Sequence, residues 1–73
     1  MVHPKIEINP DIMLGKPVIR GTRITVESIL RKLAAGVAAE NVIRDHPGLT
    51  LDDIRAAQAF AADYIAEEEL VFD

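Results

Sequence analysis

The stretch that decides the fold is TVESILRKLAAG, residues 25–36. Its apolar residues recur at the spacing of one helical face, at positions 26, 29, 30 and 33. Thr25 precedes this face as an N-cap, and Gly36 follows it where a helix commonly ends in a left-handed residue. The stretch therefore predicts one amphipathic helix with a buried face.

A second, short helix is predicted over residues 39–44, with Val42 and Ile43 facing inward and Pro47-Gly48 ending it. Each of the two helices is short, and brief connections set neighbouring helices at steep angles.

The third predicted helix runs from about Leu51 to about Glu67. Thr50 is its expected N-cap, and Asp53 three residues later resembles the acidic partner of a capping box. Its apolar residues keep the helical period and predict a continuous apolar stripe: Leu51, Ile54, Ala57, Phe60 or Ala61, Tyr64 and Ile65.

On the N-terminal side, two short strands are predicted over residues 5–8 and 18–20. The first alternates apolar and charged residues and ends at the turn signal Asn9-Pro10-Asp11. A two-strand hairpin is unstable alone, so we expect it to pack on the helices or to pair with another chain.

The predicted fold class is mainly α, a short N-terminal β-hairpin followed by three helices in helix-turn-helix order. A plain three-helix bundle has nearly the same signature. We expect one domain over residues 1–73, divided into a hairpin arm (1–24), a tri-helical core (25–67) and an acidic tail (68–73).

The chain has only 73 residues and no cysteine. A domain of this size buries roughly 60% of its unfolded surface, which gives a marginal core. Disulfides and Cys-based zinc sites are excluded, so good helix packing or association with another chain must supply the remaining stability. We therefore expect a homodimer.

The net charge of −4 is unevenly placed along the chain. Residues 1–25 carry +2, residues 26–50 are neutral and residues 51–73 carry −6. The negative net charge of the whole chain argues against non-specific binding to nucleic acid. A basic N-terminal part and an acidic C-terminal part, however, suit two different partners. We see no signal peptide and no membrane-spanning run, so a cytoplasmic location is expected.

Several motifs occur together in a specific order: GKPVIRGTRI (residues 15–24), LAAG (33–36) and HPGLTLDDI (46–54). From about Lys5 to about Tyr64, the chain resembles the family called domain of unknown function 433. The resemblance implies a homeodomain-like tri-helical fold behind a hairpin. It also implies an antitoxin of a type II toxin–antitoxin pair, which binds a PIN-like ribonuclease toxin and represses its own operon by binding operator DNA.

Lys16, Arg20 and Arg23 place three cations within eight residues. Arg and Lys on a hairpin can contact phosphates or a minor groove. The alternative is structural, with the arginines holding carbonyls or carboxylates of the fold. A phosphate-binding P-loop is excluded, because Pro10 and Pro17 occupy positions where that motif needs Gly and Ser or Thr.

The third helix offers Thr50, Arg55 and Gln58 as candidate DNA contacts, since Arg pairs well with guanine and Gln with adenine. Asp52 and Asp53 in its first turn suit the helix dipole but repel phosphates. A purely scaffolding role for this helix is therefore the competing interpretation.

The chain ends in Glu67, Glu68, Glu69, Leu70, Val71 and Phe72, followed by Asp73. This segment combines acids that suit a basic surface with apolar anchors that suit a groove. It is the predicted toxin-binding segment; a solvated tail is the alternative.

Catalysis has little support. His3 and His46 are the only histidines, no metal-ligand spacing is present, and Ser28 is the only serine. We expect no enzyme activity, no metal and no cofactor. The resulting hypothesis is a homodimeric antitoxin; the alternative is a non-enzymatic protein-interaction module with no nucleic-acid role.

Overall fold

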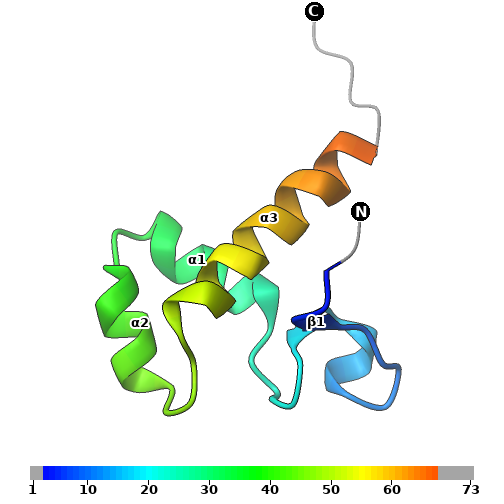
Figure 1. Cartoon of the computed structure of the whole chain (residues 1–73), viewed down its shortest axis with the longest axis horizontal. Coiled ribbons are helices and arrows are strands. Elements are labelled where there is room, and N and C mark those ends of the chain that lie inside the picture. The colour runs from blue at the N-terminus through cyan, green and yellow to red at the C-terminus, as the bar shows by residue number, and fades with distance from the viewer. Residues whose placement is uncertain (1–2, 68–73) are drawn as a thin grey trace, which may run out of the picture.

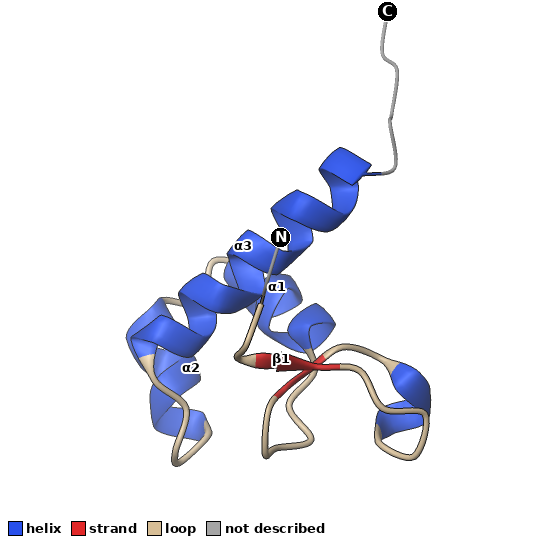
Figure 2. Cartoon of the chain, turned by 45° about the vertical axis from the view of Figure 1, so that its right-hand side comes forward, coloured by secondary structure: helices blue, strands red, loops and turns tan. Residues whose placement is uncertain are grey.

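The computed structural model describes residues 3–67, which form a short two-strand sheet followed along the chain by three helices (Figures 1 and 2). The elements are β1 (Ile6–Glu7), a 3₁₀ turn (Met13–Gly15), β2 (Val18–Ile19), α1 (Val26–Ala34), α2 (Ala39–Asp45) and α3 (Leu51–Glu67). The mainly helical class with an N-terminal hairpin is confirmed. Within the described residues, no helix is long and apolar enough to cross a bilayer.

The two strands pair in antiparallel fashion, with Ile6 opposite Ile19 and Glu7 opposite Val18. Each strand is shorter than the sequence predicted. On its other edge β2 makes a single bridge, from Val18 to Thr25, the residue that begins α1. The hairpin is thereby joined directly to the helical part of the molecule.

Both predicted boundaries of the first helix are confirmed. The Thr25 hydroxyl accepts a hydrogen bond of 3.0 Å from the Ser28 N–H, which satisfies one free donor of the first turn. After the last turn, Gly36 has φ of +92°, a left-handed conformation that glycine adopts without a Cβ clash.

One apolar core joins the sheet to all three helices. Its buried residues are Ile6, Ile19, Val26, Ile29, Val42, Leu49, Ile54 and Ala57. Helix α3 contacts α1, α2 and β1, so it is the element around which the others pack. Figures 1 and 2 show its C-terminal half extending beyond the rest of the fold.

The predicted apolar stripe on α3 is only partly buried. Ile54 and Ala57 lie in the core, but Leu51 is 45% exposed, Tyr64 57% and Ile65 55%. The 17 residues of α3 and the 9 of α1 correspond to lengths of about 25 Å and 13 Å. Helix α3 is therefore longer than the helix that packs beside it, and its last two turns keep their apolar side chains uncovered.

Candidate functional site

Arg20 contacts the backbone of the hairpin. Its Nε donates to the Pro4 carbonyl at 2.8 Å, and its Nη2 donates to the Ile6 carbonyl at 3.2 Å. The guanidinium thus holds the chain on both sides of Lys5, whose own carbonyl accepts from the Arg20 N–H at 2.8 Å. For Arg20, this geometry supports the interpretation that the side chain holds carbonyls of the fold rather than contacting nucleic acid.

The other two hairpin cations lie differently. Lys16 is exposed and pairs with Glu27 of α1 at 3.1 Å. Arg23 is exposed and makes no hydrogen bond or ion pair with any residue between 3 and 67. Its loop is held by Thr22, whose hydroxyl donates to the Ile19 carbonyl at 2.7 Å and accepts from the Ile24 N–H at 3.0 Å. Within residues 3–67, Arg23 is therefore an exposed cation without an ion-pair partner, on a loop held by two hydrogen bonds.

The first turn of α3 contains the predicted capping pair. The Thr50 N–H donates to Asp53 Oδ2 at 2.9 Å, and the Asp53 N–H donates to Thr50 Oγ1 at 3.2 Å. Asp53 Oδ1 also lies 3.5 Å from the Lys5 Nζ. Burial alone raises the pKa of Asp53, but the Thr50 hydrogen bonds and the Lys5 charge together bring it below its ordinary value.

The ion pair between Asp53 and Lys5 reduces the negative charge that the first turn of α3 presents to solvent. The Asp53 carboxylate is buried and neutralised by Lys5, so in the first turn of α3 only the Asp52 charge faces solvent. Arg55 and Gln58 are exposed one turn apart, on the same side of the helix. The structure therefore brings Arg55 and Gln58 together on one surface, while Thr50, although exposed, has its hydroxyl engaged by the cap.

At the opposite end of α3, Glu67 is exposed and is the last described residue. The other members of the predicted toxin-binding segment, Glu68, Glu69, Leu70, Val71 and Phe72, lie outside the described residues.

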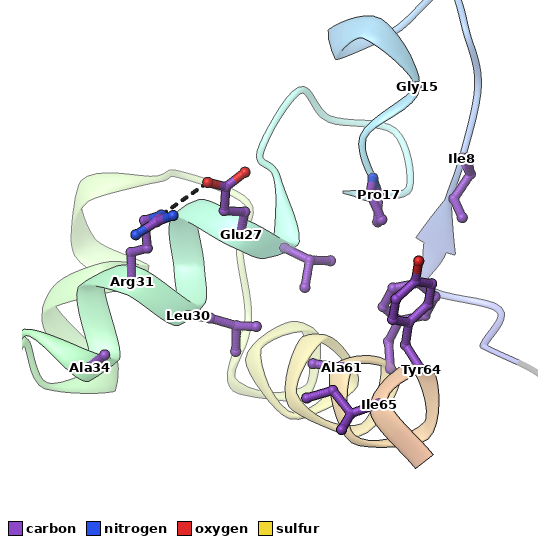
Figure 3. A pocket seen from close by; sticks show the side chains of 12 residues that line it. Ile8, Gly15, Pro17, Glu27, Leu30, Arg31, Ala34, Ala61, Tyr64 and Ile65 are labelled. Atoms are coloured by element: carbon purple, nitrogen blue, oxygen red, sulfur yellow. Dashed lines mark hydrogen bonds and ion pairs between the residues drawn. The ribbon is translucent and has the colours of Figure 1, made fainter. Parts of the chain in front are cut away.

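An apolar groove of about 670 Å³ lies between the hairpin, α1 and the C-terminal half of α3 (Figure 3). Its walls are mostly apolar side chains, among them Ile8, Pro17, Leu30, Phe60, Tyr64 and Ile65. The small side chains of Ala34 on α1 and Ala61 on α3 also line it. Exposed apolar surface gathered into one patch in this way is typical of a binding surface.

The charged residues of the groove are paired with one another. Glu27 Oε2 accepts from Arg31 Nε at 3.0 Å, and Glu27 Oε1 accepts from Lys16 Nζ at 3.1 Å (Figure 3 shows the Glu27–Arg31 pair). The Arg31 guanidinium, followed by the Lys16 ammonium, lowers the pKa of Glu27. With Lys16 beside the groove, the three side chains together leave a net positive charge at the edge where the hairpin meets α1.

Both histidines have structural contacts. His3 Nε2 lies 2.8 Å from Asp63 Oδ2, and its ring packs edge-on against Phe60 with a centroid distance of 5.4 Å. His46 Nε2 lies 2.9 Å from the Lys32 Nζ, which links the end of α2 to α1. Within residues 3–67, no group of three or more His, Asp or Glu side chains is arranged to hold a metal ion.

The fold and these surfaces define a small, mainly helical protein with a hairpin-capped three-helix unit and an apolar groove. The chain belongs to the family described as "Protein of unknown function (DUF433)", whose sequence profile matches residues 6–61.

Two similar proteins place the chain in context. It is 40% identical over 53 residues to "Uncharacterized protein y4eO" of Sinorhizobium fredii, a match that covers 73% of this chain and 24% of that protein. The crystal structure of a DUF433 member from Anabaena variabilis superposes with a TM-score of 0.80 at 28% identity, covering 86% of this chain and 62% of that one. The chain therefore spans about a quarter of the first relative and less than two thirds of the second.

The sequence patterns did not indicate the groove. Tyr64 and Ile65 were assigned to the apolar stripe of α3, and Ile8 to a strand. A signal was nonetheless present, because α3 has 17 residues whereas α1, which packs beside it, has only 9. Unequal helix lengths in a short chain thus predict an uncovered apolar end.

Proposed function

We propose that this chain is an antitoxin of the type II class, which binds operator DNA with the N-terminal half of α3 and a PIN-like ribonuclease toxin with its acidic C-terminal end. One observation carries the proposal. Helix α3 exposes Arg55 and Gln58 on its first turns with Asp53 neutralised, and it ends at Glu67, where the acidic sequence continues.

The DNA-binding half rests on the arrangement of α2 and α3. They are consecutive, contacting helices joined by residues 46–50, which is the order of a helix-turn-helix. In such a unit the second helix presents its N-terminal residues to base edges. Arg55 and Gln58 have the chemistry for guanine and adenine, and Arg23, an exposed cation with no ion pair among the described residues, is suited to a phosphate.

The toxin-binding half rests on charge. Residues 51–73 carry −6, and most of that charge lies toward the end of the chain. A ribonuclease binds a polyanion and so presents a basic surface around its active site. An acidic segment with apolar anchors can cover that surface and exclude RNA from it.

A salt titration on the DNA upstream of the gene tests the first half. Arg55→Ala should weaken binding by about 1–3 kcal/mol and relax specificity at one base position. Arg23→Ala should weaken it and reduce the salt slope by about 0.9. Both side chains are exposed and make no hydrogen bond or ion pair with another described residue, so folding should be intact.

The matched control is Ala62→Glu, which lowers the net charge by the same single unit at an exposed position on the C-terminal half of α3, away from the proposed DNA contacts. If all three variants lost the same DNA affinity, the effect would come from the net charge of the chain and not from specific contacts. An intact chain that binds its upstream DNA no better than an unrelated sequence would contradict the DNA-binding half and favour a protein-interaction module without a nucleic-acid role.

Inhibition of a PIN-like ribonuclease encoded beside the gene tests the second half. Replacing Glu67, Glu68 and Glu69 with Gln should weaken the complex and restore RNA cleavage, whereas Glu40→Gln on α2 should not. Unchanged inhibition by the triple variant would contradict the role of the tail. A chain that neither binds nor inhibits that ribonuclease would contradict the antitoxin assignment.

A further inference from the structure

We infer that the apolar groove is the dimer interface, occupied by the C-terminal half of α3 from a second copy of the chain. In this arrangement a two-fold axis relates the two copies, and each α3 end fills the groove of the other. The inference does not depend on toxin or DNA binding.

The groove surface contains both a hollow and a ridge. The hollow lies between the hairpin, α1 and the C-terminal half of α3, and its lining includes Ile8, Pro17 and Leu30 (Figure 3). The ridge is the overhanging end of α3, whose Tyr64 and Ile65 are 57% and 55% exposed. A two-fold interface uses the same patch on both copies, so a patch that combines a ridge with a matching hollow can bind itself.

Small residues on two walls allow the close approach of a helix. Ala34 lines the groove from α1 and Ala61 from α3, and neither side chain extends beyond its Cβ. An entering helix can therefore pack its larger side chains between them, as ridges fit into grooves in helix packing.

The charges are complementary between the two parts of the patch. Lys16 lies beside the groove and pairs with Glu27, so that Lys16, Glu27 and Arg31 together leave one net positive charge at this edge of the groove. The end of α3 carries the exposed Glu67 and the negative end of the helix dipole. A two-fold axis that inserts each α3 end into the other groove brings these opposite charges toward one another twice.

A small-molecule ligand fits the groove less well. The volume of about 670 Å³ lies within the range of ligand pockets, but such pockets orient their ligand with convergent polar groups. Here Glu27 and Arg31 are already bonded to each other. An apolar helix face can bind in the groove without polar groups to orient it. Because the core of the single chain is of marginal size, burying the apolar surface of the groove also adds stability.

Sedimentation equilibrium of the 73-residue chain tests the inference directly. The unsubstituted chain should be a dimer at micromolar concentration. Ile65→Glu should lower the dimer affinity by roughly 100-fold or more, because it places two carboxylates in an apolar interface. Far-UV circular dichroism should show an unchanged helix content, since Ile65 is exposed in the single chain.

Ala62→Glu is the matched control. It adds the same charge to an exposed position of α3 that does not line the groove, and it should leave the dimer intact. If the unsubstituted chain were monomeric at about 100 μM, the inference would be overturned. The groove would then bind another protein or another part of the same chain. Equal effects of the two glutamates would overturn it as well.

Because the sequence has no cysteine, single-cysteine variants can test the geometry. Ile65→Cys mixed with Ala34→Cys should form an intermolecular disulfide between the two variants under mild oxidation. Gln58→Cys mixed with Ala34→Cys should do so at least about tenfold more slowly, since Gln58 lies outside the groove. Equal rates for the two mixtures would overturn the proposed arrangement.

Discussion

Thr50 and Asp53 cap α3 reciprocally, each donating its backbone N–H to the other's side chain at 2.9 and 3.2 Å. The same Asp53 carboxylate lies 3.5 Å from the ammonium of Lys5, next to β1. One side chain therefore begins the central helix and ties the hairpin to it. Removing its charge affects both contacts at once.

Asp53→Asn should lower the free energy of unfolding at pH 7 by about 1–2 kcal/mol, because the cap loses a charged acceptor and Lys5 loses its partner. Urea denaturation measures this difference. The control is Asp52→Asn, which removes the same charge from an exposed position one residue earlier. Equal losses for the two variants would mean that only the helix dipole is involved.

The effect of Asp53 should depend on pH in a defined direction. Its pKa in the folded chain lies below the ordinary value of 3.8. The contribution is therefore complete above pH 3.8 and is lost as the pH falls through the lower folded value. The stability gap between the unsubstituted chain and Asp53→Asn should stay constant from about pH 7 to pH 5 and narrow below about pH 4. A gap that closes already at pH 6 would contradict this assignment.

Arg20 should behave as a structural residue. Arg20→Ala and Arg20→Lys should each lower the free energy of unfolding by about 1–2 kcal/mol, because an ammonium cannot reproduce the two directed bonds to Pro4 and Ile6. Arg23→Ala, the charge-matched control, should change it by less than about 0.5 kcal/mol. If Arg20→Ala were as stable as the unsubstituted chain, the guanidinium would be available for nucleic acid after all.

Short-range signals predicted the helices well. Thr25, Thr50 and Asp53 act within three residues of their partners, so the sequence alone indicates both the cap and its acceptor. Long-range partners gave no such signal. Lys5 and Asp53 lie 48 positions apart, and the acceptors of Arg20 are backbone carbonyls, which every residue carries.

The apolar stripe along α3 was predicted from the sequence, but how much of it is buried was not. The helical period shows which residues share a face, but it does not show how far a neighbour covers that face. Ile54 and Ala57 are covered, whereas Tyr64 and Ile65, on the last two turns, are not. In the sequence, only the greater length of the third predicted helix indicated that an apolar end would stay uncovered.

The contact between His3 and Asp63 should couple the start of the chain to α3. The pair lies 2.8 Å apart, with side chains 14% and 28% exposed. A double-mutant cycle with His3→Phe and Asp63→Asn should give a coupling energy of about 0.5–1 kcal/mol, and His3→Phe retains an aromatic ring against Phe60. Additive effects of the two substitutions would show that the pair adds nothing to stability.

Leu14 should be replaceable by glycine with a gain in stability. It has φ of +57°, in a region that costs a residue with a Cβ about 1–2 kcal/mol, and its side chain is 94% exposed, so little packing is lost with it. Glycine adds about 0.4–1 kcal/mol of unfolded-state entropy, which leaves a net gain of about 0.5 kcal/mol for Leu14→Gly in urea denaturation. Leu14→Ala keeps the Cβ and should be neutral, whereas Leu14→Val should lose about 1 kcal/mol, because a β-branched residue is poorly accommodated at positive φ. A loss of stability for Leu14→Gly larger than that for Leu14→Ala would show that the turn is not strained at this position.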